Sequence, residues 1–163
     1  MMPFARSIDT VLGLLSGQAL AQLECVPEHD LNEWKPRQDL EDINTFYALA
    51  THPVAAGEYW ILHAAGGRPL ERDRPAEFRA RGDLPSLKSR YERWLADARD
   101  VLSSLTEDDL TRIIARDADP KSGSRAVHWS VADCLIHAVE HTAVHVGHLQ
   151  IQRQLWNAER SQS

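Results

Sequence analysis

The sequence contains few cysteines and no excess of positive charge. Its 163 residues include two cysteines, Cys25 and Cys134, which are too few for a disulfide framework and fit a reducing compartment. The formal net charge is −6, whereas binding to nucleic acid calls for a basic surface. The sequence therefore predicts a cytoplasmic protein that has no nucleic-acid partner.

Long hydrophobic runs are also absent. No run of about eighteen apolar residues occurs, so we expect no membrane span. The N-terminal segment MMPFARSIDTVLGLLSGQAL lacks the basic start and the long apolar core of a signal peptide. Hydrophobic residues make up 43% of the chain and charged residues 26%, which is an ordinary globular balance. The simplest interpretation is one domain over residues 1–163.

Histidine, by contrast, is concentrated in one stretch. Half of the eight histidines lie within twelve residues, at His137, His141, His145 and His148, with gaps of four, four and three. This is helix spacing, and at about 100° per residue these side chains and Cys134 fall within an arc of roughly 80°. Apolar residues flank the arc on both sides, so we expect the histidines mid-way across the face that packs into the core. The flanking residues are Ala138, Leu149 and Trp156 on one side and Val144, Ile151 and Leu155 on the other.

A stack of histidines on a core-facing stripe favours a metal site. One buried imidazole is easily satisfied by a backbone carbonyl, but several together are harder to satisfy, and each unsatisfied ring costs free energy. A divalent ion takes a lone pair from each ring, and two histidines at i and i+4 can bind one ion. The zinc-peptidase motif H-E-x-x-H is absent, so at least one further ligand must come from elsewhere.

Apolar periodicity predicts four long helices, over residues 4–24, 40–65, 84–104 and from the cap Ser130 to about residue 156. Such a four-helix bundle builds metal sites from inward-facing side chains. The connecting segments 25–40 and 68–85 are predicted to be loops, and the charges of the second are expected to be solvated. Residues 110–115 are predicted to be extended. Residues 117–125 read as a polar turn. Gly13 and Gly17 in the first helix could allow close packing against another helix.

The second helix offers two candidates for the third ligand. His52 and His63 are eleven residues apart and almost in phase on an α-helix. His52 lies mid-helix, whereas His63 lies near the end, where a histidine often meets carbonyl groups or solvent. We therefore prefer His52, although Pro53 directly after it either kinks the helix or marks a break. Tyr59 lies further along the same stripe and could face the ion.

Two segments carry a resemblance to a known family. The segment ALATHPVAAGEYWIL and the segment HWSVADCLIHAVEHTAVHVGHLQ, whose H-x-x-x-H-x-G pattern falls on His141, His145 and Gly147, resemble the DinB superfamily of metal-binding four-helix bundles. The resemblance implies an all-α, up-down-down-up bundle in which His52, His141 and His145 bind one divalent ion, commonly zinc or nickel. It also implies a homodimer. The residue after Gly147 is His148 where many relatives have glutamine, which leaves open whether His148 joins the site.

The resemblance leaves three classes of function open. The first is a metal-dependent enzyme acting on a small molecule, either an S-transferase that uses a low-molecular-weight thiol or a hydrolase; three ligands would leave an open position on the ion. In that case Tyr59, His137 and His148 could contact the ligands or the substrate. Cys134 could be a fourth ligand or simply a small buried side chain. The other classes are a non-catalytic metal-binding or stress-response protein, and an interaction module whose histidines are satisfied internally.

Overall fold

The computed structural model describes residues 1–36, 43–116 and 126–161. Its elements are, in chain order, α1 (Pro3–Ala21), α2 (Glu28–Glu33), α3 (Phe46–Gly57), the π-helix η1 (Glu58–Ala65), α4 (Arg74–Glu77), α5 (Leu84–Ser104), α6 (Glu107–Leu110), β1 (Ile113–Arg116), β2 (Val127–Ser130) and α7 (Val131–Arg160).

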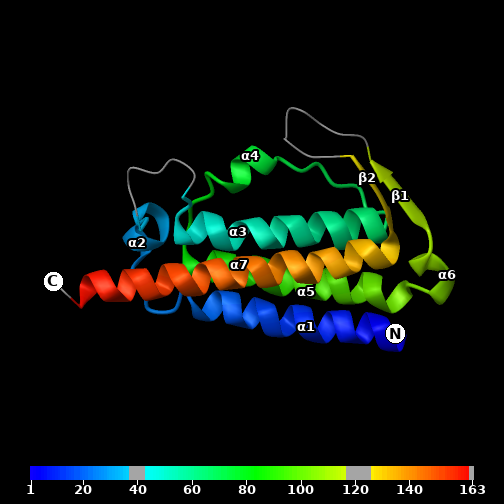
Figure 1. The fold of residues 1–163 in the computed structure, drawn as a ribbon, viewed down its shortest axis with the longest axis horizontal. Helices are drawn as coiled ribbons and strands as arrows, with labels where there is room; N and C mark the ends of the chain where they lie inside the picture. The colour runs from blue at the N-terminus through cyan, green and yellow to red at the C-terminus, as the bar shows by residue number, and fades with distance from the viewer. Residues whose placement is uncertain (37–42, 117–125, 162–163) are drawn as a thin grey trace.

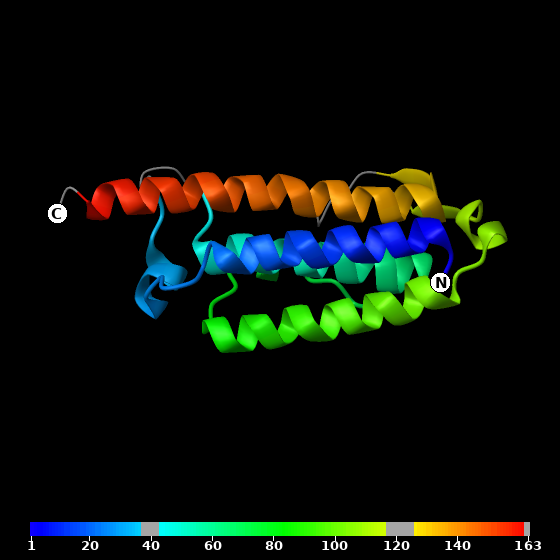
Figure 2. The ribbon, with the colours of Figure 1, turned by 90° about the horizontal axis from the view of Figure 1, so that it is seen from below.

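Four long helical segments lie side by side and form the bundle (Figures 1 and 2). Helix α7 packs against α1 and α3, and α5 packs against α1 and η1. Helices α1 and α7 run in one direction, while α3 and α5 run in the other, because the connection that carries α4 returns along the bundle before α5 begins (Figure 1). The predicted all-α, up-down-down-up bundle is confirmed.

Side-chain caps define where the helices begin. Thr45 accepts a hydrogen bond from the Ala48 amide at the start of α3. Ser130 and Asp133 form a capping box at the start of α7, as the sequence predicts. Each cap satisfies amide groups that the first helical turn leaves without a partner. Helix α7, which carries the histidine stretch, therefore begins directly after strand β2.

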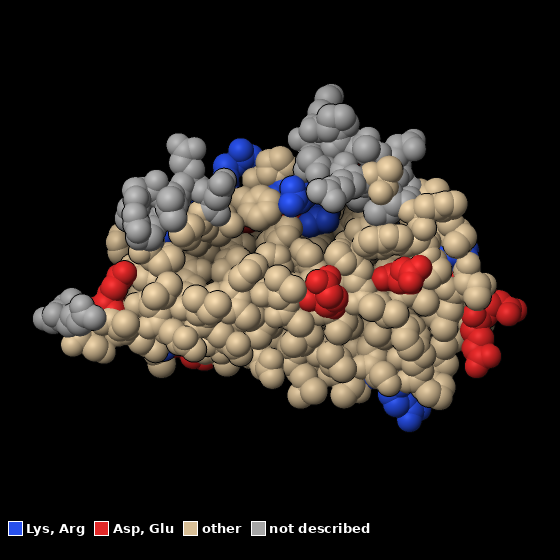
Figure 3. Space-filling model, viewed as in Figure 1, with Lys and Arg blue, Asp and Glu red and all other residues tan. Residues whose placement is uncertain are grey.

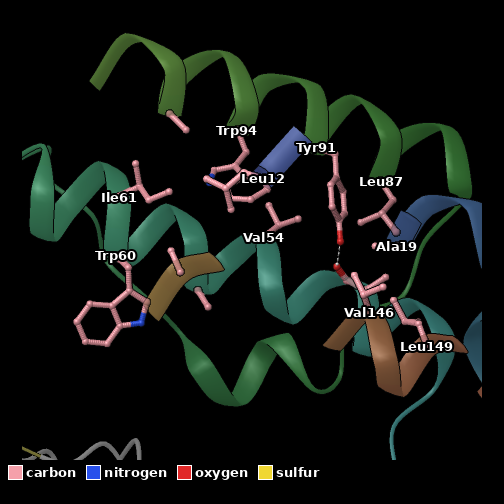
Figure 4. Packing of buried hydrophobic residues seen from close by; sticks show 14 of the residues in the cluster. Leu12, Ala19, Val54, Trp60, Ile61, Leu87, Tyr91, Trp94, Val146 and Leu149 are labelled. Carbon is pink, nitrogen blue, oxygen red and sulfur yellow. Dashed lines mark hydrogen bonds between the residues drawn. The ribbon is translucent and has the colours of Figure 1, made fainter. Parts of the chain in front are cut away.

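Large aromatic residues of α5 fill the centre of the bundle (Figure 4). Tyr91 and Trp94 are each 1% exposed, and the Tyr91 hydroxyl donates a hydrogen bond of 2.8 Å to the carbonyl of Ala50. The Trp94 ring lies directly over Gly57, where a Cβ atom would overlap the indole. This contact requires glycine at the junction of α3 and η1, and it fixes the distance between the second and third long helices.

The second long helix differs from the prediction in two ways. It begins at Phe46, and it continues through Pro53 without a break. Its last eight residues, Glu58–Ala65, are π-helical. A π-helix has more residues per turn than an α-helix, so each residue rotates less around the helix axis. His63 therefore does not lie on the same face as His52, as it would on a continuous α-helix.

The connections hold more structure than the sequence predicts. The expected loop 25–40 contains α2, and the expected loop 68–85 contains α4. The extended stretch near 110–115 is confirmed as β1, which pairs with β2 in an antiparallel hairpin that the sequence analysis missed. The polar turn expected at 117–125 lies outside the described residues. Gly13 and Gly17 approach no other described part of the chain, since a Cβ at either position would meet nothing within 4 Å.

The histidine face of α7 is rotated relative to the prediction. Cys134, Ala138, Thr142, Val146 and Leu149 point into the core, so the histidines border the core face instead of lying mid-way across it. The apolar residues on the far side of the histidines are exposed: Val144 at 46%, Ile151 at 57% and Leu155 at 43%. Among the helices that the structure describes, none is long and apolar enough to cross a membrane.

Candidate metal centre

Three histidines from two helices meet at one point. His52 of α3 faces His141 and His145 of α7, and the three offer ligand atoms within 4.8 Å of one another. The Nε2 atoms of His52 and His141 are 3.2 Å apart, and the rings of His52 and His145 have centroids 4.8 Å apart. His141 and His145 stand on consecutive turns of α7, so both rings project toward α3. The structure thus brings together the three residues that the resemblance implies as ligands.

A buried carboxylate orients His52. The Nδ1 atom of His52 donates to Oε2 of Glu77 at 2.6 Å, and the Glu77 side chain is 6% exposed. Arg72 holds the same carboxylate with two hydrogen bonds, from Nε to Oε1 at 2.6 Å and from an Nη atom to Oε2 at 2.9 Å. The Phe78 ring packs against the His52 ring, at a centroid distance of 4.7 Å. With its Nδ1 atom hydrogen-bonded to Glu77, His52 directs its Nε2 atom toward His141.

The electrostatics disfavour protonation of His141 and His145 and favour the charged form of the supporting carboxylate of Glu77. Burial, together with the positive charges of neighbouring groups, lowers the pKa of His141 to about 3 and that of His145 to about 4. Burial alone would raise the pKa of Glu77, but the hydrogen bonds from His52 and Arg72 outweigh it and lower that pKa below its usual value. At neutral pH His141 and His145 therefore keep lone pairs free for an ion.

The donor set fits a divalent ion. The buried Nδ1 atoms of His141 and His145 make no hydrogen bond to any described residue, and such an unsatisfied buried atom costs about 1–3 kcal/mol. Two nitrogen ligands at about 2.0–2.1 Å from a tetrahedral zinc ion are about 3.3 Å apart. The observed 3.2 Å between the Nε2 atoms of His52 and His141 is close to that separation. The spacing of these two Nε2 atoms is therefore compatible with their binding one ion.

The two other histidines of the α7 stretch lie next to the group of three. The His148 ring is 5.4 Å from that of His145, and the His137 ring is 5.6 Å from that of His141. His137 also contacts the rings of Trp60 and Trp129.

Tyr59, Cys134 and His63 lie outside the group of three. Tyr59 lies under the Arg72 guanidinium, 5.7 Å from the ring centroid. Cys134 is fully buried in the hydrophobic core and is not among the residues whose ligand atoms converge. The Nδ1 atom of His63 contacts the Arg68 carbonyl at 2.8 Å, in agreement with the expectation for a histidine near a helix end.

The residues that support His52 were missed by the sequence analysis. Arg72, Glu77 and Phe78 all fall in the segment that was expected to be a solvated loop. A local signal was present, since Asp73 caps α4 and Pro75 lies in its first turn, a typical helix start. That signal predicts a short helix but not its contact with His52, which joins residues 25 positions apart.

A cavity opens beside the histidines on the side toward the end of α7. Its volume is about 380 Å³, and His145 forms part of its wall. The other lining residues are Pro36, Ile43, Asn44, Leu49, His148, Ile151, Gln152 and Leu155. Figure 3 shows the surface hollowed between the connection that carries α4 and helix α7, and the atoms visible over α7 below the hollow are mostly uncharged. A ligand in this cavity would lie next to the three-histidine site.

A comparison with known protein families identifies the family of this chain. The family model described as the DinB superfamily matches residues 4–149, nearly the whole chain. The chain belongs to the DinB superfamily. His52, His141 and His145 all lie within the matched segment. No curated protein sequence matches this DinB superfamily chain at a significant level.

Two solved structures share the fold of this DinB superfamily chain. They are crystal structures of the mycothiol-dependent maleylpyruvate isomerase and of a histidine-to-alanine mutant of that enzyme. The TM-scores are 0.61 and 0.56, and the sequence identities are 15% and 14%. The alignments cover 91% of this chain and 63% of each isomerase chain. At this identity the likeness shows the fold alone.

Proposed function

We propose that this protein is a divalent-metal-dependent enzyme that acts on a small molecule, with His52, His141 and His145 as the protein ligands of one ion. The observation that carries the proposal is a three-histidine cluster, supported by a buried carboxylate, at the wall of a ligand-sized cavity. Structural metal sites usually have four protein ligands, whereas catalytic sites keep an open position. Three converging histidines beside a cavity favour the catalytic arrangement.

The chain's own residues would prepare the site in three ways. Glu77 holds the proton of His52 on Nδ1, and Arg72 keeps that carboxylate ionised and fixed. Burial keeps His141 and His145 neutral at pH 7. A bound divalent ion would act as a Lewis acid that stabilises a thiolate or polarises a carbonyl group. Imidazole ligands suit zinc and nickel, the two metals that we propose first.

Thiol-dependent transfer or isomerisation is the first choice of reaction. The isomerase that shares the fold is mycothiol-dependent, and thiolate is a preferred ligand of zinc. A hydrolase is the alternative within the same chemistry. In addition we propose that the protein is a homodimer, which rests on the family resemblance.

Two measurements test the proposal. Protein purified without an affinity tag should contain one divalent ion per chain by elemental analysis, and added zinc or nickel should raise the unfolding midpoint of metal-free protein. The visible spectrum of cobalt-substituted protein should then change when a small thiol is added. A protein without stoichiometric metal and without stabilisation by either ion would refute the metal site. A cobalt spectrum that stays unchanged at millimolar thiol would instead refute the open position.

A further inference from the structure

The cavity beside His145 has a composition that specifies part of its ligand. Four of its wall residues, Ile43, Leu49, Ile151 and Leu155, are aliphatic, and no lining residue among the described part of the chain carries a formal charge. Gln152 is 5% exposed, and its side-chain amide donates to the Asn44 carbonyl at 3.1 Å. Some polar groups of this wall are therefore already hydrogen-bonded to one another.

The cavity and the three-histidine site share a residue. His145 belongs to the converging trio and also lines the cavity, so a molecule that fills the cavity has one end next to the ligand atoms. Glu77 and Arg72, the charged pair behind His52, do not line it. A ligand in the cavity would therefore contact both the aliphatic wall and His145.

The size of the cavity matches a small organic ligand. Pockets that bind such ligands span roughly 300–1,000 Å³, and the observed volume is about 380 Å³. Ile151 and Leu155 are 57% and 43% exposed, which leaves apolar surface in contact with water unless a ligand covers it. Covering that surface is favourable in proportion to its area.

From these observations we infer that the cavity binds the uncharged aliphatic part of a small molecule whose other end carries a metal-binding group. This inference rests on the proposed function and adds to it the chemical class of the substrate. It favours a hydrophobic thiol or electrophile over a molecule with a charged tail. The preference arises because a charge would have to leave water for a wall whose described residues carry no formal charge.

A series of straight-chain thiols, from ethanethiol to hexanethiol, tests the inference on cobalt-substituted full-length protein. The affinity, measured from the visible spectrum, should rise between about two- and fourfold for each added methylene, the upper value applying to a methylene fully removed from water. A thiol of similar length that ends in a carboxylate should bind more weakly than its alkyl counterpart. An affinity that does not depend on chain length would overturn the inference.

Two matched variants locate the effect. Ile151→Glu places a charge on the cavity wall at an exposed helix position and should abolish the dependence on chain length. Leu14→Glu makes a comparable change at an exposed position of α1, 62% exposed and outside the cavity lining, and should leave the dependence intact. Both variants should still bind cobalt, which separates failure of this inference from failure of the metal site itself.

Light scattering on the same samples tests whether a second copy of the chain, and not a small molecule, covers the aliphatic wall. If Ile151→Glu dissociates a dimer and the thiol series is flat in the unmodified protein, the aliphatic wall is an interface between two copies of the chain. That outcome would overturn the small-molecule inference. A thiol series that shows the expected gain in a protein whose oligomeric state is unchanged by Ile151→Glu supports it.

Discussion

Replacing Glu77 by glutamine removes one negative charge from the support of His52 and leaves the side chain almost the same size. In the unmodified protein the Glu77 carboxylate is 6% exposed and accepts hydrogen bonds from His52 and Arg72. Glutamine can still accept from His52 through its oxygen, but its amide nitrogen faces a guanidinium that also only donates. The substitution therefore weakens the orientation of His52 without deleting a ligand.

The expected loss is a factor of about 10 to 100 in metal affinity, the usual effect of changing a partner of a ligating histidine. This equals about 1.4–2.7 kcal/mol of binding free energy. The result should be measured by competition between the protein and a chromophoric chelator for zinc. The unfolding midpoint of the metal-free variant should be recorded alongside it, because Arg72 is left with a weaker partner.

The chain supplies a control of the same chemistry. Glu58 also accepts two hydrogen bonds from one arginine, Arg90, at 3.2 and 2.7 Å, but it makes no hydrogen bond to a histidine. Glu58→Gln should therefore leave zinc affinity unchanged. Equal zinc affinity in Glu77→Gln, Glu58→Gln and the unmodified protein would show that the carboxylate does not tune the site, and the reasoning would be wrong.

Three further outcomes follow from the structure. His52→Ala should weaken zinc binding more than Glu77→Gln does, whereas His63→Ala should change it little because the ring of His63 contacts the Arg68 carbonyl; the reverse ranking would contradict the proposed ligand set. The pKa values of about 3 for His141 and about 4 for His145 lie below the usual 6.5, so the unfolded chain takes up protons first. Chelator-treated protein should accordingly lose stability in urea as the pH falls from about 6.5 to 5, and a flat profile would refute the assignment. Gly57→Ala should destabilise the protein by roughly 1–3 kcal/mol through overlap with Trp94, whereas Gly13→Ala should stabilise it by up to about 1 kcal/mol in the same denaturation assay.

Periodicity and local capping signals predicted most of the fold. The long helices α1, α5 and α7 repeat apolar residues at helical spacing, and Ser130 with Asp133 marks the start of α7. The apolar pattern predicts a start of α3 before the observed Phe46, and it does not predict the π-helical end. That end lies where Gly57 lets Trp94 approach the backbone, a contact between segments far apart in the sequence. Local patterns carry no information about such contacts.

The proposed ligands were predicted from histidine spacing and family resemblance together, whereas their supporting residues were not predicted at all. The spacing of His141 and His145 follows from one helix and is visible in the sequence. The contact of Glu77 with His52 depends on the path of the segment between η1 and α5, which has no periodic pattern. A charged, proline-containing segment is typical of surface, but here it contains the ion pair of partly buried Arg72 with buried Glu77.

The rotation of α7 also changes the chemistry that the site can support. Histidines in the middle of the core face, as the apolar pattern indicated, would be enclosed on all sides and would favour a closed structural site. In the structure they stand at the border, with Thr142 and Val146 buried on one side and Ile151 and Leu155 exposed on the other. Glu77 and Phe78 contact His52, and the cavity that His145 lines extends toward the end of α7. The same exposed aliphatic residues that contradict the sequence prediction thus form the wall along which we expect a substrate to reach the ion.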